Sequence, residues 1–288
     1  MSTPSCSRLL AVREYDLAAT LTSGQAFRWR WHGEAWRGVV HRRWVELRVT
    51  SEGILAHTAE PQTEWSWLEA YLQTGIELGA ILRTFPADAA LRASVEACRG
   101  LRLLRQEPWE CLASFILSST KQIVQIQQII GLLCERFGEE LAVPPGDAPA
   151  QAFPSAPALA CATEAQLRAC KMGFRAPNLL AAARAVDAGR LDLAAVAQCE
   201  LAEAKARLME LSGVGPKIAD CVLLFAYGYP AAFPVDVWVK KALRELYFPK
   251  RAPRPARLQQ FIATYFGPNA GYAQQYLFHY MRTRPKYK

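Results

Sequence analysis

A lysine and an aspartate, Lys217 and Asp236, lie 19 residues apart in the last third of the chain. Lys217 follows Gly215-Pro216, a pattern typical of a helix start, so its ammonium would face the positive end of a helix dipole. That position and the neighbouring apolar residues both favour the neutral amine, which is the nucleophilic form. A carboxylate at Asp236 could stabilise developing positive charge and assist proton transfer. The pair therefore fits an enzyme that attacks an electrophilic carbon through an amine.

Each residue of this pair also has an ordinary explanation. Lysines usually lie at the surface, and Lys217 could be solvated or could neutralise a phosphate. Asp236 precedes Val237-Trp238-Val239 and could serve only to cap a helix. Neither residue is decisive alone, and it is their pairing that favours the catalytic interpretation.

A tight turn precedes the lysine and joins two apolar helical patterns. The first helix, with Leu208 and Leu211 on one face, is predicted to end at Ser212-Gly213. We expect Gly213 and Gly215 to adopt backbone angles closed to other residues and to let a phosphate approach closely. Free N–H groups of Gly213-Val214-Gly215 and of the following helix would then bind an anion. The pattern alone is also compatible with an ordinary corner between two helices.

The charge is distributed unevenly along the chain, which has a net charge of +8. Residues 240–288 hold eleven Lys or Arg and a single acid, Glu245, so this segment carries +10 and the remainder about −2. A basic region on a near-neutral body favours a polyanionic partner, because phosphate contacts release condensed counterions. The alternative is a basic face that is merely solvated.

Composition limits the class of protein. A length of 288 residues with 51% hydrophobic content suggests about two domains with ample core. No apolar run is long enough to span a bilayer, and residues 1–8 lack signal-peptide features, so we expect an intracellular protein. That would place it in the cytoplasm or nucleoid of a bacterium, or in the nucleus of a eukaryote. The eight cysteines form no Cys-x-x-Cys pair, which argues against a zinc site and a disulfide framework.

Periodicity predicts an α+β fold, in which a small antiparallel β domain leads into a large all-α domain. Residues 8–60 show short alternating runs between turns, including one over 27–31, which is typical of a meander. From about residue 64 the period becomes helical, with a break near 118–121 and a surface loop over 144–157. The last helix is expected around 271–281. We place the domain boundary between residues 107 and 108.

Several segments together resemble the 8-oxoguanine DNA glycosylase branch of the helix-hairpin-helix (HhH-GPD) glycosylase superfamily. Six of them occur in the order of the family: Ser23–Trp29, Glu107–Ser119, Gly173–Ala176, Gly213–Asp220, Pro234–Val237 and Gly271–Phe278. A hairpin match alone would be weak, whereas six ordered matches cover nearly the whole chain.

The resemblance implies a bifunctional DNA glycosylase and AP lyase of base excision repair. A damaged nucleotide would be flipped out of the duplex. Lys217 would then attack the sugar carbon, expel the base and form an imine, and β-elimination would break the strand. Asp236 would stabilise the charged intermediate. The implied partner is double-stranded DNA containing oxidised guanine, bound by a monomer. No cofactor is expected, since no cysteine follows Cys221 to hold an iron–sulfur cluster.

The same resemblance assigns a base pocket. A glycine carbonyl, at Gly24 here, would accept the N7–H that oxidised guanine has and guanine lacks. Cys221 and Phe278 match the residues that sandwich the base, Gln274 the one that reads its pairing edge, and Pro234 belongs to the same pocket. Considered without the resemblance, core packing would explain Phe278 and Cys221, and a helix-surface amide would explain Gln274.

A second set of residues is implied for the opposite strand, and part of it departs from the family pattern. Phe174 stands where we expect a tyrosine wedge, and Arg175 would face the orphaned base. Thr120 replaces an asparagine, Gln125 replaces an arginine that reads cytosine, and Trp238 replaces a histidine near the phosphate. Glutamine lacks the guanidinium fork and charge. We therefore expect weaker discrimination between opposite bases than the family norm.

Two other functions remain open from the sequence. One is a glycosylase of the same fold for another damaged base, such as an alkylated purine, although an enzyme that activates only water would not need Lys217. The other is a non-catalytic DNA-binding module, which would leave Lys217 with Asp236 unexplained.

Overall fold

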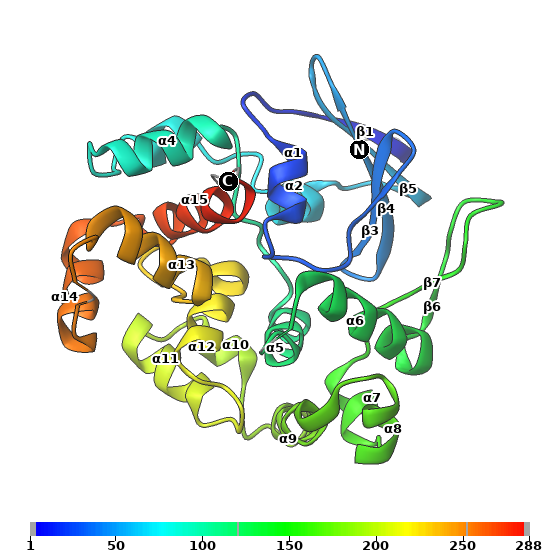
Figure 1. The fold of residues 1–288 in the computed structure, drawn as a ribbon. Coiled ribbons are helices and arrows are strands. Elements are labelled where there is room, and N and C mark those ends of the chain that lie inside the picture. Colours follow the sequence, from blue (N-terminus) through cyan, green and yellow to red (C-terminus); the bar gives the residue numbers. More distant parts are fainter. Residues whose placement is uncertain (1–3, 120, 252, 285–288) are drawn as a thin grey trace.

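In the computed structural model an antiparallel sheet forms first and helices follow, so the predicted α+β arrangement is confirmed (Figure 1). The structure describes residues 4–119, 121–251 and 253–284. Among these residues no helix is long and apolar enough to cross a membrane.

The five-stranded sheet has the order β1-β5-β4-β3-β2. Its strands are β1 (Ser5–Ala11), β2 (Arg30–His32), β3 (Ala35–Val40), β4 (Arg43–Thr50) and β5 (Gly53–Gln62). Each neighbouring pair is antiparallel. Strands β2 to β5 form the predicted meander, whereas β1 pairs with β5 at the other edge. Val45 and Leu47, two residues apart on β4, point to the same face of the sheet, and both side chains are fully buried.

The N-terminal elements differ from prediction in two places. Between β1 and β2 lies a short helix, α1 (Leu17–Thr22), which begins where the Asp16 carboxylate accepts a hydrogen bond from the Ala19 N–H at 2.8 Å. The predicted strand over residues 27–31 is only partly present, because β2 begins at Arg30. Phe27 and Trp29 are both buried in an irregular extended segment. The alternating apolar pattern of this segment therefore reflects the burial of these two side chains and not hydrogen bonding to a neighbouring strand.

The helices that follow enclose a large apolar core. They are α2 (Ser66–Leu72), α3 (Leu78–Leu82), α4 (Ala89–Ala97), α5 (Pro108–Leu117), α6 (Ile123–Phe137), α7 (Ala156–Ala160), α8 (Glu164–Ala169), α9 (Ala176–Asp187), α10 (Leu193–Val196), α11 (Leu201–Met209), α12 (Pro216–Val222), α13 (Val237–Ala242), α14 (Pro255–Tyr265) and α15 (Ala270–Thr283). A 3-10 turn, η1 (Gly173–Arg175), precedes α9, and π-helical turns η2 (Leu223–Tyr227) and η3 (Leu243–Tyr247) extend α12 and α13. The predicted break near residues 118–121 separates α5 from α6.

Two helical-region predictions were incomplete. The expected loop over 144–157 contains the connection and second strand of a small hairpin, which pairs β6 (Glu140–Leu141) with β7 (Ala150–Gln151), and then the start of α7. Asp147, near the tip of this hairpin, pairs with Arg37 of the sheet at 2.9 Å. Helix α14 was not predicted. None of its residues is buried, so its sequence has no strong apolar pattern that would indicate a helix.

The last helix, α15, lies between the two parts of the chain and against α4 (Figure 1). The Tyr276 hydroxyl on α15 donates to the Leu101 carbonyl at 2.9 Å, and the Tyr272 hydroxyl accepts from the Leu103 N–H at 3.4 Å. Both contacts join the C-terminal helix to the segment that leads from α4 into α5. They fix α15 relative to the N-terminal part of the chain.

Candidate active site

Lys217 lies in the first turn of α12, with its amine held against the end of α5. The Lys217 Nζ donates to the Ser118 Oγ at 3.1 Å, and it lies 5.3 Å from the centroid of the Phe115 ring. Ser118 ends α5 and donates its own hydroxyl proton to the Phe115 carbonyl at 2.7 Å. A lone pair of the Ser118 hydroxyl therefore faces the lysine, and the half-buried amine is orientated through one N–H.

Asp236 is the N-cap of α13, and its carboxylate is close enough to Lys217 to feel the charge of the ammonium. Its Oδ1 accepts a hydrogen bond from the Val239 N–H at 2.8 Å. Burial raises the pKa of Asp236, while the Val239 hydrogen bond and the charge of Lys217 act in the opposite direction. The structure confirms the capping interpretation, and the charge of Lys217 also acts on the same carboxylate.

Cys221 lies one helical turn after Lys217 and completes this side of the site. Its side chain is 3% exposed, and burial raises the pKa of the thiol to about 12, with Lys217 and Asp236 as nearby charges. The thiol is therefore neutral at physiological pH and presents a soft apolar surface. Lys217, Cys221 and Asp236, which were predicted separately, are brought together.

A second group of predicted residues lies on α15 and the loop after α1. Gly24 has a φ of +76°, and a Cβ there would lie 3.4 Å from Cε1 of Phe278. Gln274 lies one turn before Phe278 on α15 and is 3% exposed. Its Oε1 is buried without a hydrogen-bond partner among the described residues. An unpaired buried amide oxygen costs ~1–3 kcal/mol, which a ligand donor would recover.

Two further features concern residues that the sequence assigns to the base pocket. Pro234 is buried two residues before Asp236, as part of the segment leading into α13. Within the described part of the chain, no donor reaches the carbonyl of Gly24. The structure thus brings Gly24 next to Phe278, one turn from Gln274, and leaves two acceptors without a donor from the described residues.

The helix–turn–helix segment confirms one glycine requirement and corrects the other. Gly213 has a φ of +81°, and a Cβ there would lie 2.3 Å from Nδ2 of Asn178. Gly215 has a φ of −93° and a ψ of −179°, and a Cβ there would meet nothing within 4 Å, so its backbone is open to any residue. The Val214 N–H is also not free, since it donates to the Leu211 carbonyl at 3.1 Å. In this turn the available donors are thus those of Gly213 and Gly215.

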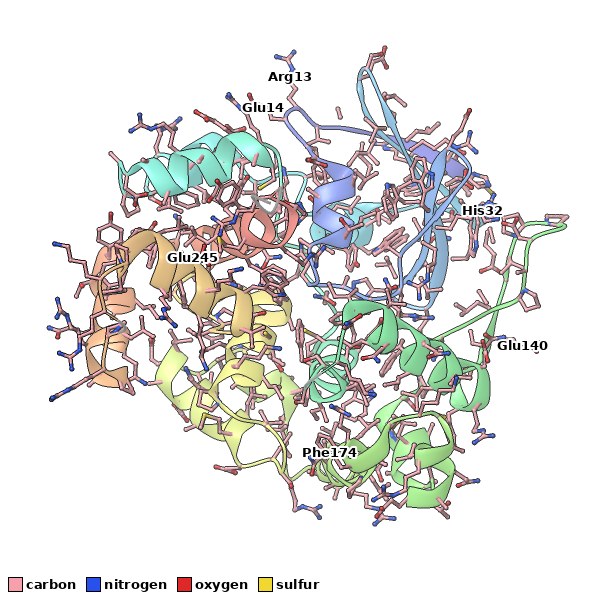
Figure 2. The ribbon with its side chains drawn as sticks, viewed as in Figure 1. Arg13, Glu14, His32, Glu140, Phe174 and Glu245 are labelled. Carbon is pink, nitrogen blue, oxygen red and sulfur yellow. The ribbon has the colours of Figure 1, made fainter. Side chains whose placement is uncertain are left out.

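Phe174 and Arg175 form a single surface feature at η1. Phe174 is 61% exposed at the outer surface (Figure 2), and the Arg175 guanidinium lies 4.2 Å from the centroid of its ring. Arg175 is itself only 2% exposed, and it donates to the carbonyls of Met172 and Ser119. The phenyl ring projects, while the arginine beneath it is tied to the end of α5.

The three residues that depart from the family pattern are differently placed. Gln125 is exposed in the first turn of α6, where its Oε1 accepts from the Gln122 N–H at 3.1 Å. Trp238 is half-buried in the first turn of α13, with the Lys241 Nζ 5.8 Å from its ring centroid. Thr120 lies outside the described residues.

Basic side chains are exposed on the elements that follow Asp236. They lie on α13, η3, the next loop and the start of α14: Lys240, Lys241, Arg244, Lys250, Arg251, Arg254 and Arg257. The basic segment predicted from the sequence is therefore exposed to solvent, and it begins on α13, the helix that Asp236 caps.

No metal centre is formed by the described part of the chain. The eight cysteines are free thiols. Among the described residues, no three His, Cys, Asp or Glu side chains are grouped to hold a metal ion.

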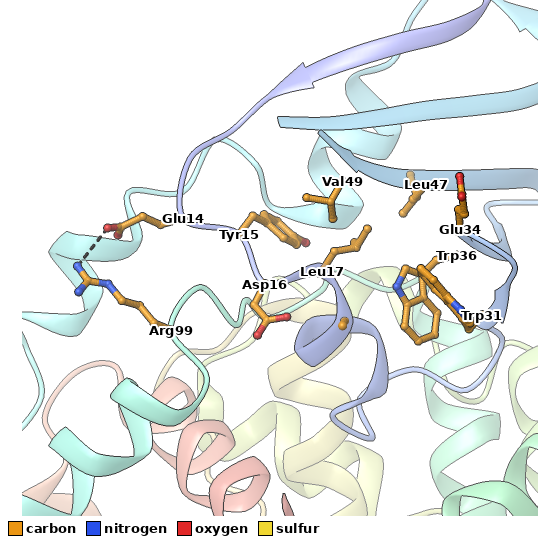
Figure 3. Close-up of a pocket in the computed structure, with 11 residues that line it drawn as sticks. Glu14, Tyr15, Asp16, Leu17, Trp31, Glu34, Trp36, Leu47, Val49 and Arg99 are labelled. Atoms are coloured by element: carbon orange, nitrogen blue, oxygen red, sulfur yellow. Dashed lines mark hydrogen bonds and ion pairs between the residues drawn. The ribbon is translucent and has the colours of Figure 1, made fainter. Parts of the chain in front are cut away.

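A separate hollow of about 650 Å³ lies between the sheet and α1 (Figure 3). Trp31, Trp36 and Val49 line it on the sheet side, and Glu14 at its edge pairs with Arg99 at 3.1 Å. It contains none of the predicted site residues. The chemistry of Lys217 is therefore not located in this hollow.

Ser118, Gln275 and Arg282 contribute to the site but were not among the predicted site residues. Ser118 fell inside a matching segment, so its position next to a helix break was the signal that could have identified it. On α15, Gln275 directly follows Gln274, and Arg282 lies one turn after Phe278. Their contacts to the loop after α1 span more than 250 residues of chain. No local pattern marks such contacts.

Comparison with known proteins is consistent along the whole chain. The family model for the 8-oxoguanine DNA glycosylase N-terminal domain matches residues 9–112, and that for HhH-GPD superfamily base excision DNA repair proteins matches residues 113–268. The N-glycosylase/DNA lyase OGG1 of Arabidopsis thaliana is 31% identical, covering 92% of this chain and 77% of that protein.

Solved structures agree with these matches. The 8-oxoguanine glycosylase/lyase of Clostridium acetobutylicum, in complex with double-stranded DNA containing cytosine opposite 8-oxoG, has a TM-score of 0.88 and 32% identity, covering 93% of this chain and 92% of that one. A 3-methyladenine DNA glycosylase from Archaeoglobus fulgidus has a TM-score of 0.78 at 21% identity, covering 96% of this chain and 98% of that one, which shows a shared fold alone. The chain belongs to the 8-oxoguanine DNA glycosylase family of the HhH-GPD superfamily of base excision DNA repair proteins.

Proposed function

We propose that the chain is a bifunctional DNA glycosylase, which removes 8-oxoguanine from duplex DNA through an imine on Lys217 and then cleaves the strand as an AP lyase. The observation that carries the proposal is the placement of Lys217 and Asp236 as charges next to Cys221. Gly24 in contact with Phe278, on the helix that also carries Gln274, supports it. The relatives named N-glycosylase/DNA lyase and 8-oxoguanine glycosylase/lyase support it.

The first step is displacement of the base by the amine. The lone pair of neutral Lys217 Nζ forms a bond to the anomeric carbon as the bond from that carbon to the base breaks, and the base leaves with the electron pair. One proton of the amine neutralises the departing base. The other goes to the ring oxygen as its bond to the anomeric carbon breaks, which opens the sugar ring and leaves an imine. The Asp236 carboxylate stabilises the positive charge that develops on the sugar. Ser118 holds Nζ through one N–H, so that the lone pair is directed elsewhere.

The second step is strand cleavage. Removal of a proton from the sugar carbon next to the imine leaves an electron pair that the imine nitrogen delocalises. That pair then forms a carbon–carbon double bond as the bond from the next carbon to the 3′ phosphate oxygen breaks, and the phosphate leaves with the electrons of the broken bond. Water then hydrolyses the imine and frees Lys217. No metal is required at any step of this sequence.

Recognition rests on the two acceptors left free in the pocket. The Gly24 carbonyl accepts the N7–H of the oxidised base, whereas guanine would oppose this carbonyl with a lone pair at a cost of ~1–3 kcal/mol. The Gln274 Oε1 accepts from the donors on the pairing edge of guanine. Phe278 and Cys221 cover the two faces of the base, and Pro234 closes the pocket near Asp236.

The remaining predicted residues contact the DNA outside the pocket. Phe174 enters the duplex as the wedge, and Arg175 supports it. Gln125 and Trp238 lie toward the opposite strand and the backbone, to which the family resemblance also assigns Thr120. The N–H groups of Gly213 and Gly215, with Val214 as the buried centre of the turn, bind a phosphate.

The domain division and the location of the protein complete the proposal. Residues 1–107 form the N-terminal β domain, and residues 108–288 form the catalytic helical domain. The enzyme acts as a monomer wherever the genome lies, in the bacterial cytoplasm and nucleoid or in a eukaryotic nucleus.

Borohydride trapping on a duplex with one 8-oxoguanine opposite cytosine tests the mechanism. Wild-type protein should form a covalent adduct, and Lys217→Gln should form none. Lys240→Gln is the matched control, because it removes an exposed ammonium from the neighbouring helix and should retain the adduct at saturating protein. Base release by wild type without an adduct would refute the imine. Release of a different base would favour an alkylated-purine enzyme, and DNA binding without release would favour a binding module.

A further inference from the structure

The loop after α1 is held by its carbonyl groups. The Thr22 carbonyl accepts from Arg282 Nη2 at 2.5 Å, and the Ser23 carbonyl accepts from Gln275 Nε2 at 3.0 Å. On the far side, the Gln25 carbonyl accepts from Gln106 Nε2 at 2.6 Å. Residues 22–25 present four consecutive carbonyls, and among them only the carbonyl of Gly24 receives no donor from the described chain. The loop is thus fixed on both sides of one free acceptor.

Two of these donors come from the helix that forms the base pocket. Arg282 and Gln275 both lie on α15, which also carries Gln274 and Phe278. A Cβ on Gly24 would lie 3.4 Å from Arg282 Nη1 and 3.4 Å from the Phe278 ring. One helix therefore carries the stacking wall and the amide, and also sets the position of the Gly24 carbonyl.

Arg282 is poorly explained as a stabilising residue alone. Its Nη1 is buried without a hydrogen-bond partner among the described residues, and its guanidinium lies 5.5 Å from the centroid of the Phe278 ring. Burial lowers the pKa of Arg282, so the fold keeps this charge at a cost. A half-buried arginine whose buried Nη1 donates to no described group is better explained by the Thr22 carbonyl that it holds in place.

We infer that Arg282 and Gln275 are positioning residues that aim the Gly24 carbonyl at the flipped base, and so determine selectivity for a purine with an N–H at position 7. The inference rests on the proposed function. Neither side chain needs to touch the base. Releasing either carbonyl would let the loop relax, and the carbonyl would lose its fixed direction toward N7. Selectivity should then fall, while contacts to sugar and phosphate persist.

Binding measured without chemistry tests this inference. In a Lys217→Gln background, dissociation constants would be measured for three otherwise identical duplexes, containing 8-oxoguanine, guanine or a tetrahydrofuran abasic analogue. Arg282→Met and Gln275→Met should each lower the preference for 8-oxoguanine over guanine by about fivefold, the effect of one hydrogen bond. Affinity for the abasic duplex, which offers no base to read, should stay within about twofold.

Controls separate positioning from a general role. Arg284→Met removes a guanidinium two residues further along, where it pairs with Glu245, and should leave the preference unchanged. Arg282→Lys keeps a donor and should restore part of the preference. Thermal unfolding of each variant checks the fold, and partly exposed Arg282 carries the test if buried Gln275→Met does not fold.

Two results would overturn the inference. An unchanged preference in Arg282→Met would show that the loop needs no such support. An equal loss of affinity for all three duplexes would show that Arg282 contacts the backbone of the DNA. Failure of the proposed function is distinct, since the Lys217→Gln parent itself would then bind 8-oxoguanine no better than guanine.

Discussion

At the scale of single residues, Asp236 shows how one carboxylate serves both the fold and the chemistry. It caps α13 through the Val239 N–H, and it lies in the field of Lys217. Capping needs an acceptor, which asparagine also supplies, whereas charge stabilisation needs a carboxylate. Substitution can therefore separate the two roles.

We predict that Asp236→Asn lowers base excision by about 10²–10⁴-fold without destabilising the protein at neutral pH. Burial raises the pKa of Asp236, so protonation of this carboxyl stabilises the folded protein relative to the unfolded chain. That stabilisation is present below the ordinary pKa of aspartate and is lost as the pH rises through the raised pKa. The amide of the variant is neutral at every pH, so thermal unfolding should show the variant equal to or above wild type at neutral pH. The difference should shrink in acid.

Asp236→Ala is the matched control for the cap. It should lose excision and also about 1 kcal/mol of stability, because the Val239 N–H loses its acceptor. If Asp236→Asn excised 8-oxoguanine at the wild-type rate, the carboxylate would have no part in the reaction.

Gln125 provides a second residue-scale prediction, for the opposite strand. It is exposed at the start of α6 and lacks the charge and fork of arginine. Single-turnover excision with C, A, G or T opposite the lesion should therefore vary by much less than about a hundredfold. Gln125→Arg should sharpen the preference for C by about 1–3 kcal/mol, the discrimination of a bidentate contact. A strong preference for C in wild type would contradict the prediction.

At the scale of elements, the turn between α11 and α12 contains two glycines with different physical roles. Gly213 requires its left-handed backbone and its contact with Asn178, whereas Gly215 has an ordinary backbone and open space around it. The absence of a side chain at Gly215 therefore has no reason in the fold. It is consistent with close approach of a phosphate.

We predict opposite outcomes for alanine at these two positions. Gly213→Ala should lose about 1–3 kcal/mol of stability, from the strained φ and the overlap with Asn178. Gly215→Ala should change stability by less than about 0.5 kcal/mol, yet weaken binding to undamaged duplex by about 1 kcal/mol. Denaturant unfolding and fluorescence anisotropy measure the two effects. Normal DNA binding by Gly215→Ala would rule out a phosphate at this glycine.

The elements that could be predicted are those whose signals are local. The break after α5 follows the polar run at residues 118–121, and α9 begins beside Pro177. By contrast, β1 depends on pairing with β5, where Leu10 lies opposite Ile54, and α14 buries no residue fully. The same difference between local and long-range signals holds for the site. Lys217 and Asp236 lie within segments that the family pattern identifies. Gln275 and Arg282 instead contact Ser23 and Thr22, which are more than 250 residues away in the sequence.

At the scale of the whole molecule, the charge is concentrated where the chain leaves the active site. Lys240 and Arg244 lie one turn apart on α13 and η3, and both are exposed. The neighbouring Glu245 is compensated by Arg284 and by Lys241 at 3.7 Å. Lys240 and Arg244 are therefore well placed to contact phosphates beside the flipped nucleotide, and their effect on binding should be local.

Salt dependence distinguishes such contacts from a general effect of net charge. Each phosphate contact contributes about 0.9 to the slope of log K against log salt, so the double variant Lys240→Gln/Arg244→Gln should reduce that slope by about 1.8. Arg8→Gln/Arg92→Gln removes the same charge from β1 and α4, and it should leave the slope unchanged. Titrations of one duplex from about 50 to about 200 mM salt would measure both. Equal reductions in the two double variants would mean that the overall field, and not contact beside Asp236, holds the DNA. Because every one of these side chains is exposed, the comparison does not depend on changes in folding.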